Sequence, residues 1–445
     1  MIEFLASQGW NRDIATFVAI LLGVVACASF GLIWVIFGIW LERKVAGRIQ
    51  DRPGPNRTGP YGLFQTFADI GKLLTKEDIT PEGADRHVYN IAPILAVAAV
   101  IMIFAVMPFS KELIGADLNI GVVYVAAVGG LATLAILLAG WGSNNKYALL
   151  GAFRVVAALI SYEVPMVLTL LIPVILAGSM SMQDIVHGQN IMYALVVPIT
   201  ALVFFISSLA EVGRSPFDLL EAESEIIAGF NIEYSGMKFA MFYAGEFIHA
   251  FVICMLTAVL FLGGWRGPGA DLPGIAGALI GFGYLFIKTN IVYFFAMLVR
   301  STVPRLRIDH MMAFNWKFLV PLSMINVVAV AVVSRIFAPN YAWAQSAYNT
   351  ALEATNLDPN LVNRLLNRVV VFVYDVFSPN AIAEFPRFIV LLLINIFLVV
   401  LLQRILRRYV GLEQRKTRDV PMSQPVDVSE APVASDGVAA ATAGR

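Results

Sequence analysis

Acidic side chains crowd one stretch of an otherwise apolar chain, residues 211–246. Only 14% of all residues are charged, so this density requires a chemical reason. The stretch directly follows one apolar segment and ends inside the next, so exposure to water does not explain it. Neighbouring carboxylates repel one another and, where solvent does not screen them, keep protons up to near-neutral pH, as a proton relay requires. The seven carboxylates of the stretch are Glu211, Asp218, Glu221, Glu223, Glu225, Glu233 and Glu246.

A short helix is predicted to begin inside this stretch. Ser215 suits its N-cap and Pro216 its first helical position. On such a helix Asp218, Glu221 and Glu225 would share one face, because they are three and four residues apart. A solvated acidic face is the alternative, and a functional acidic cluster is the interpretation we favour.

The composition is that of a membrane protein. Of the 445 residues 59% are hydrophobic, and the mean hydropathy is +0.76. A helix needs roughly 20 apolar residues to cross the hydrocarbon. The predicted fold is therefore an all-α polytopic membrane protein with about nine transmembrane helices. They are expected at about 15–40, 91–109, 121–140, 155–178, 191–210, 239–263, 275–299, 319–337 and 386–406.

Basic residues are concentrated in the connections on one side of these spans. That side holds 23 of the 31 Lys and Arg residues and the opposite side seven. The positive-inside rule places the richer side in the cytoplasm, with the N-terminus outside and the C-terminus inside. The formal net charge is zero, which gives no reason to expect nucleic-acid binding. The cytoplasmic parts are 42–90, 141–154, 211–238, 300–318 and the region after 403.

We expect a polytopic membrane domain over residues 1–410 and a cytoplasmic tail over 411–445. Beyond Arg418 the tail has no aromatic residue and no period, which predicts disorder. The segment 338–385 mixes apolar residues with Asn, Arg and Asp too often for a span, so we expect an external amphipathic element there.

The connection 42–90 combines a stiff turn region with a helical pattern. Arg52–Pro60 reads RPGPNRTGP, and each Pro restricts its own φ and the residue before it. Apolar residues then recur on one helical face, which predicts an amphipathic helix at the membrane surface. Packing beneath a partner protein is equally compatible with this pattern. The face consists of Leu63, Phe64, Phe67, Ile70 and Leu74.

Three charged residues lie well inside predicted spans, away from the span ends, namely Glu163, Glu246 and Lys288. Each costs about 2.5–3.5 kcal/mol at a helix centre, so each should face protein or a water-filled cavity. For the carboxylates we favour a functional role. For His249, three residues after Glu246, we favour a structural hydrogen bond. Lys288 is a candidate to neutralise a carboxylate.

The motifs of cofactor-binding proteins are absent from the sequence. No GxGxxG follows a strand, there is no Walker motif, and no His/Cys set has metal-ligand spacing. Cys27 and Cys254 both lie in apolar spans, where a buried apolar role is expected. We therefore expect no flavin, nicotinamide, metal or iron–sulfur cluster on this chain. Its part in any redox chemistry would be to bind an apolar substrate and to move protons.

Two long segments resemble the signature segments of a known family. They are ERKVAGRIQDRPGPNRTGPYGLFQTFADIGKLLTKE after the first span and AEVGRSPFDLLEAESEIIAGFNIEYSGMKFA after the fifth. Both are similar to the H subunit of NADH:quinone oxidoreductase, respiratory complex I, whose mitochondrial counterpart is NADH dehydrogenase subunit 1. With RSTVPRLRIDHMMAFNWKFLVPLS and the order of spans, the resemblance holds from about residue 15 to 337.

The resemblance implies a subunit of a proton-translocating enzyme of the translocase class, in the bacterial cytoplasmic (inner) membrane. This subunit anchors the hydrophilic redox arm and forms most of the quinone entry tunnel. Quinone would be the substrate, while the NADH site, flavin and iron–sulfur clusters would lie on partner subunits. Small membrane subunits, antiporter-like subunits and lipid would be further partners.

Carried over by motif, the resemblance also implies site residues of two kinds. The quinone tunnel would include Glu42, Arg43, Arg52, Asp69, Arg214, Phe217, Asp218, Arg300 and Arg305. A proton or coupling path towards the antiporter-like subunits would include Tyr162, Glu163, Glu211, Asp218, Glu221, Glu223, Glu225 and Glu246.

The family's core has eight spans, so the ninth helix and the tail depart from it and leave the role of the C-terminal region open.

Two other functions stay open at this point. Membrane-bound hydrogenase-type complexes use a similar subunit, although the full Pro-Gly loop and the intact acidic run favour the quinone enzyme. A proton-coupled transporter would also carry intramembrane Glu and Lys, but it would tend to show internal repeats, and none is found.

Overall fold

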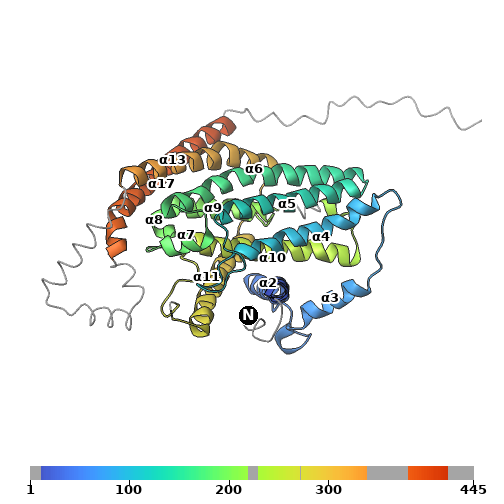
Figure 1. The fold of residues 1–445 in the computed structure, drawn as a ribbon. Helices are drawn as coiled ribbons and strands as arrows, with labels where there is room; N and C mark the ends of the chain where they lie inside the picture. The colour runs from blue at the N-terminus through green and yellow to red at the C-terminus, as the bar shows by residue number, and fades with distance from the viewer. Residues whose placement is uncertain (1–11, 219–228, 271, 338–378, 419–445) are drawn as a thin grey trace, which may run out of the picture. The chain divides into compact units, whose positions relative to one another are not determined.

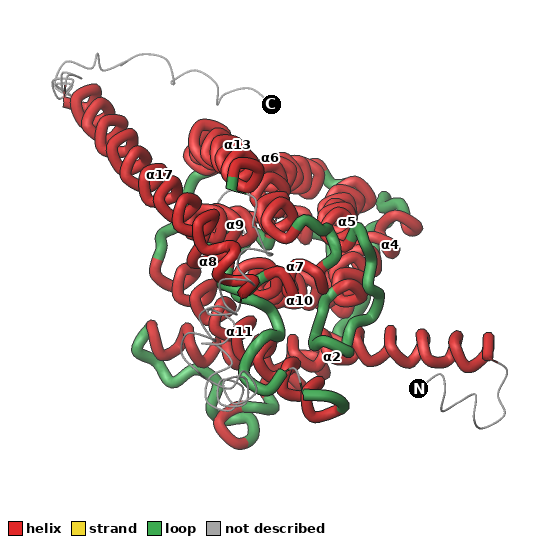
Figure 2. Tube along the Cα trace, turned by 60° about the vertical axis from the view of Figure 1, so that its left-hand side comes forward, coloured by secondary structure: helices red, strands yellow, loops and turns green. Residues whose placement is uncertain are grey.

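The computed structural model of the chain describes residues 12–218, 229–270, 272–337 and 379–418. Every regular element in these ranges is a helix (Figures 1 and 2). Eight helical stretches are long and apolar enough to cross a membrane, which confirms the all-α polytopic fold. They are α2 (Arg12–Ile49), α4 (Arg86–Ile103) with the 3-10 turn η2 (Phe104–Val106), α5 (Gly121–Gly142), α6 (Lys146–Ala177), α10 (Gly236–Phe261), α11 (Ile275–Thr302), the run of α12 (Ile308–Phe314), the π-turn η4 (Asn315–Leu319) and α13 (Val320–Ile336), and residues Glu384–Arg404 of α17 (Pro379–Arg418).

The span predicted at 191–210 is not one long helix. It consists of a single turn, α8 (Tyr193–Val196), and of α9 (Pro198–Glu211), which has 14 residues. Pro198 lacks an N–H and suits a first helical position, so a new helix begins there. At about 1.5 Å per residue α9 is shorter than the hydrocarbon core of about 30 Å. The remaining short elements are η1 (Pro60–Gly62), α3 (Gln65–Thr75), α7 (Met182–Gly188) and η3 (Gly229–Asn231).

Helix α10 is the buried centre of the bundle. It contacts α4 on one side and α2 and α11 on another, and Figure 1 shows α6, α5 and α4 running side by side next to it. In its most apolar window 89% of the residues are buried, against 17% in α2. A helix that is apolar all round is stable only inside a protein or a membrane. Two polar residues of α10, Glu246 and His249, are half-buried.

The acidic loop begins with a reversal and not with the helix predicted at Ser215. Gly213 has a φ of 72°, its N–H donates to Ala210, and the N–H of Arg214 donates to Leu209. This is a Schellman motif that ends α9. The next residues form a turn, in which Phe217 donates to Arg214 at 2.9 Å. The helix start is thus wrong, because the chain first turns back against the bundle; residues 219–228 lie outside the described ranges.

The Pro-Gly segment folds back onto the end of α2. This helix continues to Ile49, so Glu42 lies on the helix and not in the predicted loop. Trp40 donates to the carbonyl of Tyr61 at 3.2 Å, and Thr66 of α3 donates to the carbonyl of Ile36 at 3.1 Å. Helix α3 is the predicted amphipathic helix, and its location at the membrane surface stays a prediction.

Gly62 permits the Pro-Gly segment to fold back onto the end of α2, and replacing this glycine is expected to disturb that arrangement. It has a φ of +77°, and an added Cβ would lie 2.4 Å from the carbonyl oxygen of Pro55. Gly62→Ala should therefore lower the thermal stability of the assembled protein and open the loop to protease. Gly71→Ala is the matched control, because a Cβ at Gly71 meets nothing within 4 Å. Equal protease sensitivity of the two variants would contradict the expectation.

The C-terminal helix predicted at 386–406 is present as part of α17. The chain divides into two compact units, residues 1–395 and 396–445. Within the first unit Arg387 donates to the carbonyl of Leu176 at 3.3 Å and lies 4.0 Å from Glu384. Residues 338–378 and 419–445 lie outside the described ranges, as do most of the predicted external element and the predicted disordered tail. The division at residue 410 stays a prediction.

Candidate functional site: a charged cleft and a carboxylate cavity

A cleft of about 750 Å³ opens where the end of α2 meets α10 and α11. Its walls combine charged groups with the aromatic rings of Tyr243 and Phe247 from α10. Such a lining suits an apolar ring that carries polar oxygens, because the rings pack while the cations donate hydrogen bonds. The residues predicted for the quinone tunnel that line it are Glu42, Arg43, Arg52 and Arg300.

Glu42 is the centre of the charged wall. One of its carboxylate oxygens accepts hydrogen bonds from Arg214 at 2.7 Å and from Tyr293 at 2.9 Å. The other oxygen accepts from Arg300. Glu42 is only 8% exposed and Arg214 only 4%, and buried charges persist only where they are paired. One carboxylate thus holds two arginines, and this group carries one positive charge in excess beside the cleft.

Aromatic rings fix the buried arginine in place. The guanidinium of Arg214 lies 4.6 Å from the ring centroid of Phe247 and 5.7 Å from that of Tyr293. Tyr293 is packed in turn against Trp34, with ring centroids 4.8 Å apart. A cation over an aromatic face gains most where water is excluded. The acidic loop, α10 and α11 are therefore locked to α2 at the cleft.

Asp69 supports the cleft from outside it. It accepts a 2.5 Å hydrogen bond from Arg43, which lines the cleft. Gln65 of the same helix α3 donates to the other oxygen of Asp69 at 3.2 Å and accepts from Thr58 of the Pro-Gly segment at 2.8 Å. The amphipathic helix therefore holds both the loop and the cleft arginine.

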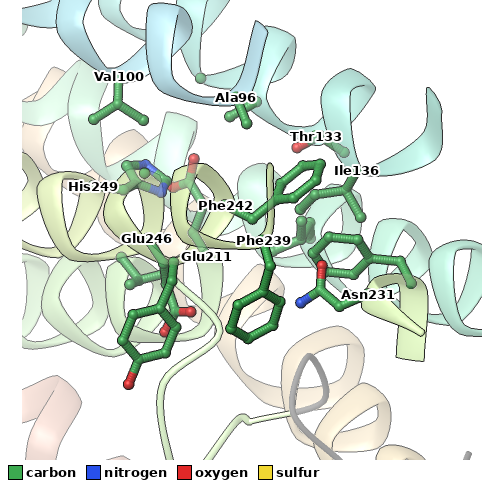
Figure 3. Close-up of a pocket in the computed structure, with 17 residues that line it drawn as sticks. Ala96, Val100, Thr133, Ile136, Glu211, Asn231, Phe239, Phe242, Glu246 and His249 are labelled. Atoms are coloured by element: carbon green, nitrogen blue, oxygen red, sulfur yellow. The ribbon is translucent and has the colours of Figure 1, made fainter. Parts of the chain in front are cut away.

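A second cavity, of about 450 Å³, lies within the helix bundle (Figure 3). It lies between residues of α4, α5, α6, η3 and the two helices that carry its acids, α9 and α10. Glu211 and Glu246 line it together with His249. Three titratable groups thus line one cavity, as a proton path requires. For His249 the structural role that we favoured from the sequence stays a prediction.

Two neighbouring glycines of α5 make room for a third carboxylate. A Cβ added to Gly129 would lie 3.3 Å from an oxygen of Glu211, and one added to Gly130 would lie 3.9 Å from an oxygen of Glu163. Both carboxylates therefore approach the same short piece of α5, one from α9 and one from α6. Glu163 therefore lies beside the cavity, close to Glu211, although it does not line the cavity itself.

Tyr243 is common to the two spaces, because it lines both the cleft and the cavity. It lies three residues before Glu246 on α10, and residues so spaced share a helix face. Tyr243 is therefore a residue through which the lining of the charged cleft meets that of the carboxylate cavity.

Tyr162, Phe217, Asp218 and Arg305, the other predicted residues that the structure describes, line neither space. Tyr162 donates to the carbonyl of Met311 at 3.0 Å, and its ring lies 5.3 Å from that of Phe217. Arg305 lies beside the acidic loop, because the N–H of the next residue, Leu306, donates to the carbonyl of Pro216 at 3.0 Å. Asp218 ends the described part of that loop. The path residues Glu221, Glu223 and Glu225 lie outside the described residues.

Glu233, part of the same acidic stretch, lies apart from both spaces. It accepts from Asn145 at 2.6 Å, and its backbone carbonyl accepts from Tyr89 at 2.7 Å. The neighbouring Tyr234 stacks on Tyr89 with centroids 4.2 Å apart, and burial raises the pKa of the Tyr234 phenol. Glu233 therefore joins the loop after the acidic run to the α5–α6 connection.

Lys288 holds backbone carbonyls in place of a carboxylate. Its ammonium donates at 2.9 Å to the carbonyls of both Gly264 and Arg266. These residues lie just beyond the end of α10, where carbonyls lack helical partners. These contacts join Lys288 to backbone carbonyls and not to the carboxylate that the sequence suggested as its partner. Lys288 secures the connection from α10 to α11.

Sequence reasoning missed three residues of this site. Tyr293 and Phe247 read as ordinary members of apolar spans, and nothing local links them to Glu42. Tyr243 could have been found, because its spacing from Glu246 places a phenol on the carboxylate face.

Known proteins match most of the chain. A family model described as NADH dehydrogenase matches residues 22–331. The NADH-quinone oxidoreductase H subunit of Dehalococcoides mccartyi (strain CBDB1) is 48% identical over 313 residues, which are 70% of this chain and 86% of that protein. The protein of the same name from Geobacillus kaustophilus is 45% identical over 337 residues, 75% of this chain and 98% of that protein. With these matches the chain belongs to the NADH dehydrogenase family.

Proposed function

We propose that the chain is the quinone-binding and proton-coupling membrane subunit of a proton-translocating NADH:quinone oxidoreductase. Its relatives are named as the H subunit of that enzyme. The observation that carries the proposal is the juxtaposition of a charged, aromatic-walled cleft and a cavity lined by carboxylates, with one tyrosine common to both. The first space suits a quinone head group and the second suits protons.

In the cleft, this chain's residues would bind and orient the quinone. The rings of Tyr243 and Phe247 would pack against the apolar ring, and Arg52 and Arg300 would donate to its oxygens. Reduction to quinol takes two electrons, supplied by a partner subunit, and two protons. Negative charge gathers on the quinone oxygens before the protons arrive. The excess positive charge around Glu42 would stabilise that charge.

In the cavity, the carboxylates would respond to this charge as one set. At 4 Å a unit pair interacts by about 4 kcal/mol at an effective dielectric constant of about 20. Charge that appears or disappears in the cleft would therefore change the protonation of Glu211, Glu246 and Glu163. Interacting sites titrate together, so a change at one end is felt at the other. The acids further along the acidic loop, Glu221 among them, would extend this set.

The proposal includes the surroundings of the chain. In this proposal the chain is a multi-pass protein of the bacterial cytoplasmic membrane. Its N-terminus is outside and its C-terminus inside, because the side richer in Lys and Arg is cytoplasmic. Hydrophilic redox-arm subunits would cover the cleft and hold the NADH site, flavin and iron–sulfur clusters. Small membrane subunits and antiporter-like subunits would receive the proton path.

Arg52 provides the test of the cleft. Arg52→Ala in the assembled complex is expected to lower kcat/KM for quinone at least about tenfold, because a hydrogen bond to a charged group contributes about 1.5–3 kcal/mol. Arg57→Ala is the matched control, since Arg57 is an exposed arginine of the same segment that does not line the cleft. NADH oxidation with a hydrophilic acceptor shows that the redox arm is intact. Unchanged quinone kinetics in Arg52→Ala would remove the cleft from the proposal.

A further inference from the structure

Helix α6 lacks one of its own hydrogen bonds directly beside Glu163. In a regular α-helix the carbonyl of Ser161 would accept from the backbone N–H four residues later. That position is Pro165, which has no N–H and whose ring crowds the carbonyl four residues before it. A proline inside a helix therefore bends it and leaves one carbonyl to be paired from elsewhere. Glu163 lies midway between these two residues, so the bend affects the direction of its side chain.

A side chain from a distant part of the sequence pairs this carbonyl. The amide Nδ2 of Asn315 donates to the carbonyl oxygen of Ser161 at 2.5 Å. Asn315 is fully buried and is the first residue of η4, the π-turn between α12 and α13. Such π-turns are rare and occur frequently at functional sites. The donor that α6 lacks is thus supplied by an irregular turn of a neighbouring helix.

A second hydrogen bond runs in the opposite direction next to the first. Tyr162 of α6 donates to the carbonyl of Met311 in α12 at 3.0 Å. Figures 1 and 2 show α13, the continuation of α12 and η4, alongside α6, and the two helices are in contact. The two bonds are made by consecutive residues of α6, and Glu163 follows directly. They therefore hold the backbone of α6 at the residue before this carboxylate.

The segment that carries Asn315 also contacts the charged cleft. It follows Arg300, which lines the cleft and donates to Glu42. Further along, the N–H of Leu306 donates to the carbonyl of Pro216 in the acidic loop at 3.0 Å. One connection thus contacts the cleft wall, the acidic loop and the bend of α6.

We propose that Asn315 is a positioning residue for Glu163. Its amide replaces the N–H that Pro165 lacks, fixes the bend of α6 and so directs the Glu163 carboxylate towards α5, where an added Cβ of Gly130 would lie 3.9 Å from it. The inference rests on the proposed function, in which Glu163 is a proton site. It adds to the path a residue that cannot ionise and that acts through the backbone of α6.

Asn315→Leu in the complete complex tests this role, because leucine is similar in size but donates no hydrogen bond. Coupled turnover, measured as proton pumping driven by NADH oxidation with quinone in sealed membranes, should fall at least about threefold, since a small misplacement of a reacting group slows a reaction. A cryo-EM map of the variant should show the Glu163 carboxylate displaced from its wild-type position. Should Asn315→Leu not assemble, Asn315→Ala is a smaller change with the same expected results.

A double-mutant comparison separates positioning from a general loss of stability. In the Glu163→Gln background, Asn315→Leu should cause no further fall in coupled turnover, because the proton site that it misplaces is already gone. Asn326→Leu is the matched control. Asn326 of α13 is also buried, but its amide donates to Thr200 at 2.6 Å and not to α6. Its variant should keep normal coupled turnover.

Four results would overturn the inference. They are normal coupled turnover in Asn315→Leu, an equal fall in both backgrounds, an equal fall in Asn326→Leu, and an unmoved Glu163 carboxylate in the map. Normal pumping in Glu163→Gln alone would instead count against the proposed function. The map of Asn315→Leu would then decide by itself whether Asn315 positions Glu163.

Discussion

Glu42→Gln is expected to cause the largest loss of stability of any change at the cleft. It removes the one carboxylate to which both Arg214 and Arg300 donate and leaves the fully buried Arg214 without that counter-charge. Breaking a buried ion pair by removing one partner costs about 3–5 kcal/mol, which is a large part of a protein's stability. The yield of assembled complex and its thermal stability in detergent should therefore fall, and quinone reductase activity should fall with them.

Asp69→Asn is the matched control for this prediction. It makes the same carboxylate-to-amide change in the Arg43–Asp69 pair, whose side chains are 42% and 26% exposed. A pair open to solvent contributes only about 0–1 kcal/mol, so this variant should assemble normally. Adding Arg214→Met to Glu42→Gln should recover part of the stability, because it removes the charge left unpaired. If Glu42→Gln were as mild as Asp69→Asn, the buried group would not hold the four segments together.

The spans could be predicted from the sequence because membrane crossing depends on local composition. The group around Glu42 could not, because its members are far apart in the chain. Arg214 is 172 residues from Glu42 and Tyr293 is 251 residues from it. No periodicity links such positions, and a tyrosine within an apolar helix looks like any other packing residue. The resemblance to a family supplied Glu42 and Arg214, but not the tyrosine that completes their hydrogen bonds.

The start of the acidic loop shows how two local signals can compete. Ser215 and Pro216 are good residues for a helix start, and they led to the wrong prediction. Gly213, two residues earlier, is a signal for the end of a helix. The structure follows this signal, because the reversal pairs the last carbonyls of α9 and buries Arg214 beside Glu42. A glycine directly after an apolar period should therefore carry more weight than the capping residues that follow it.

Neutralising the cavity carboxylates is expected to have the largest effect on proton pumping. Glu211→Gln, Glu163→Gln and Glu246→Gln each keep the shape of the side chain but remove a proton site. A positioned proton-transfer group contributes about 10²–10⁴-fold to a rate, so turnover coupled to pumping should fall at least tenfold. Glu211 should be the most sensitive, because it is only 8% exposed whereas Glu163 and Glu246 are half-buried.

The measurement separates a broken path from a broken complex. Protons moved per NADH oxidised by quinone are recorded in sealed membranes, next to NADH oxidation by a hydrophilic acceptor that bypasses the cleft. The acceptor activity should stay normal, since the redox arm is untouched. Glu112→Gln is the matched control, because Glu112 is exposed and lines neither space. Normal pumping in all three cavity variants would refute the path, and acceptor activity lost in step with quinone activity would mean that the glutamates only hold the bundle together.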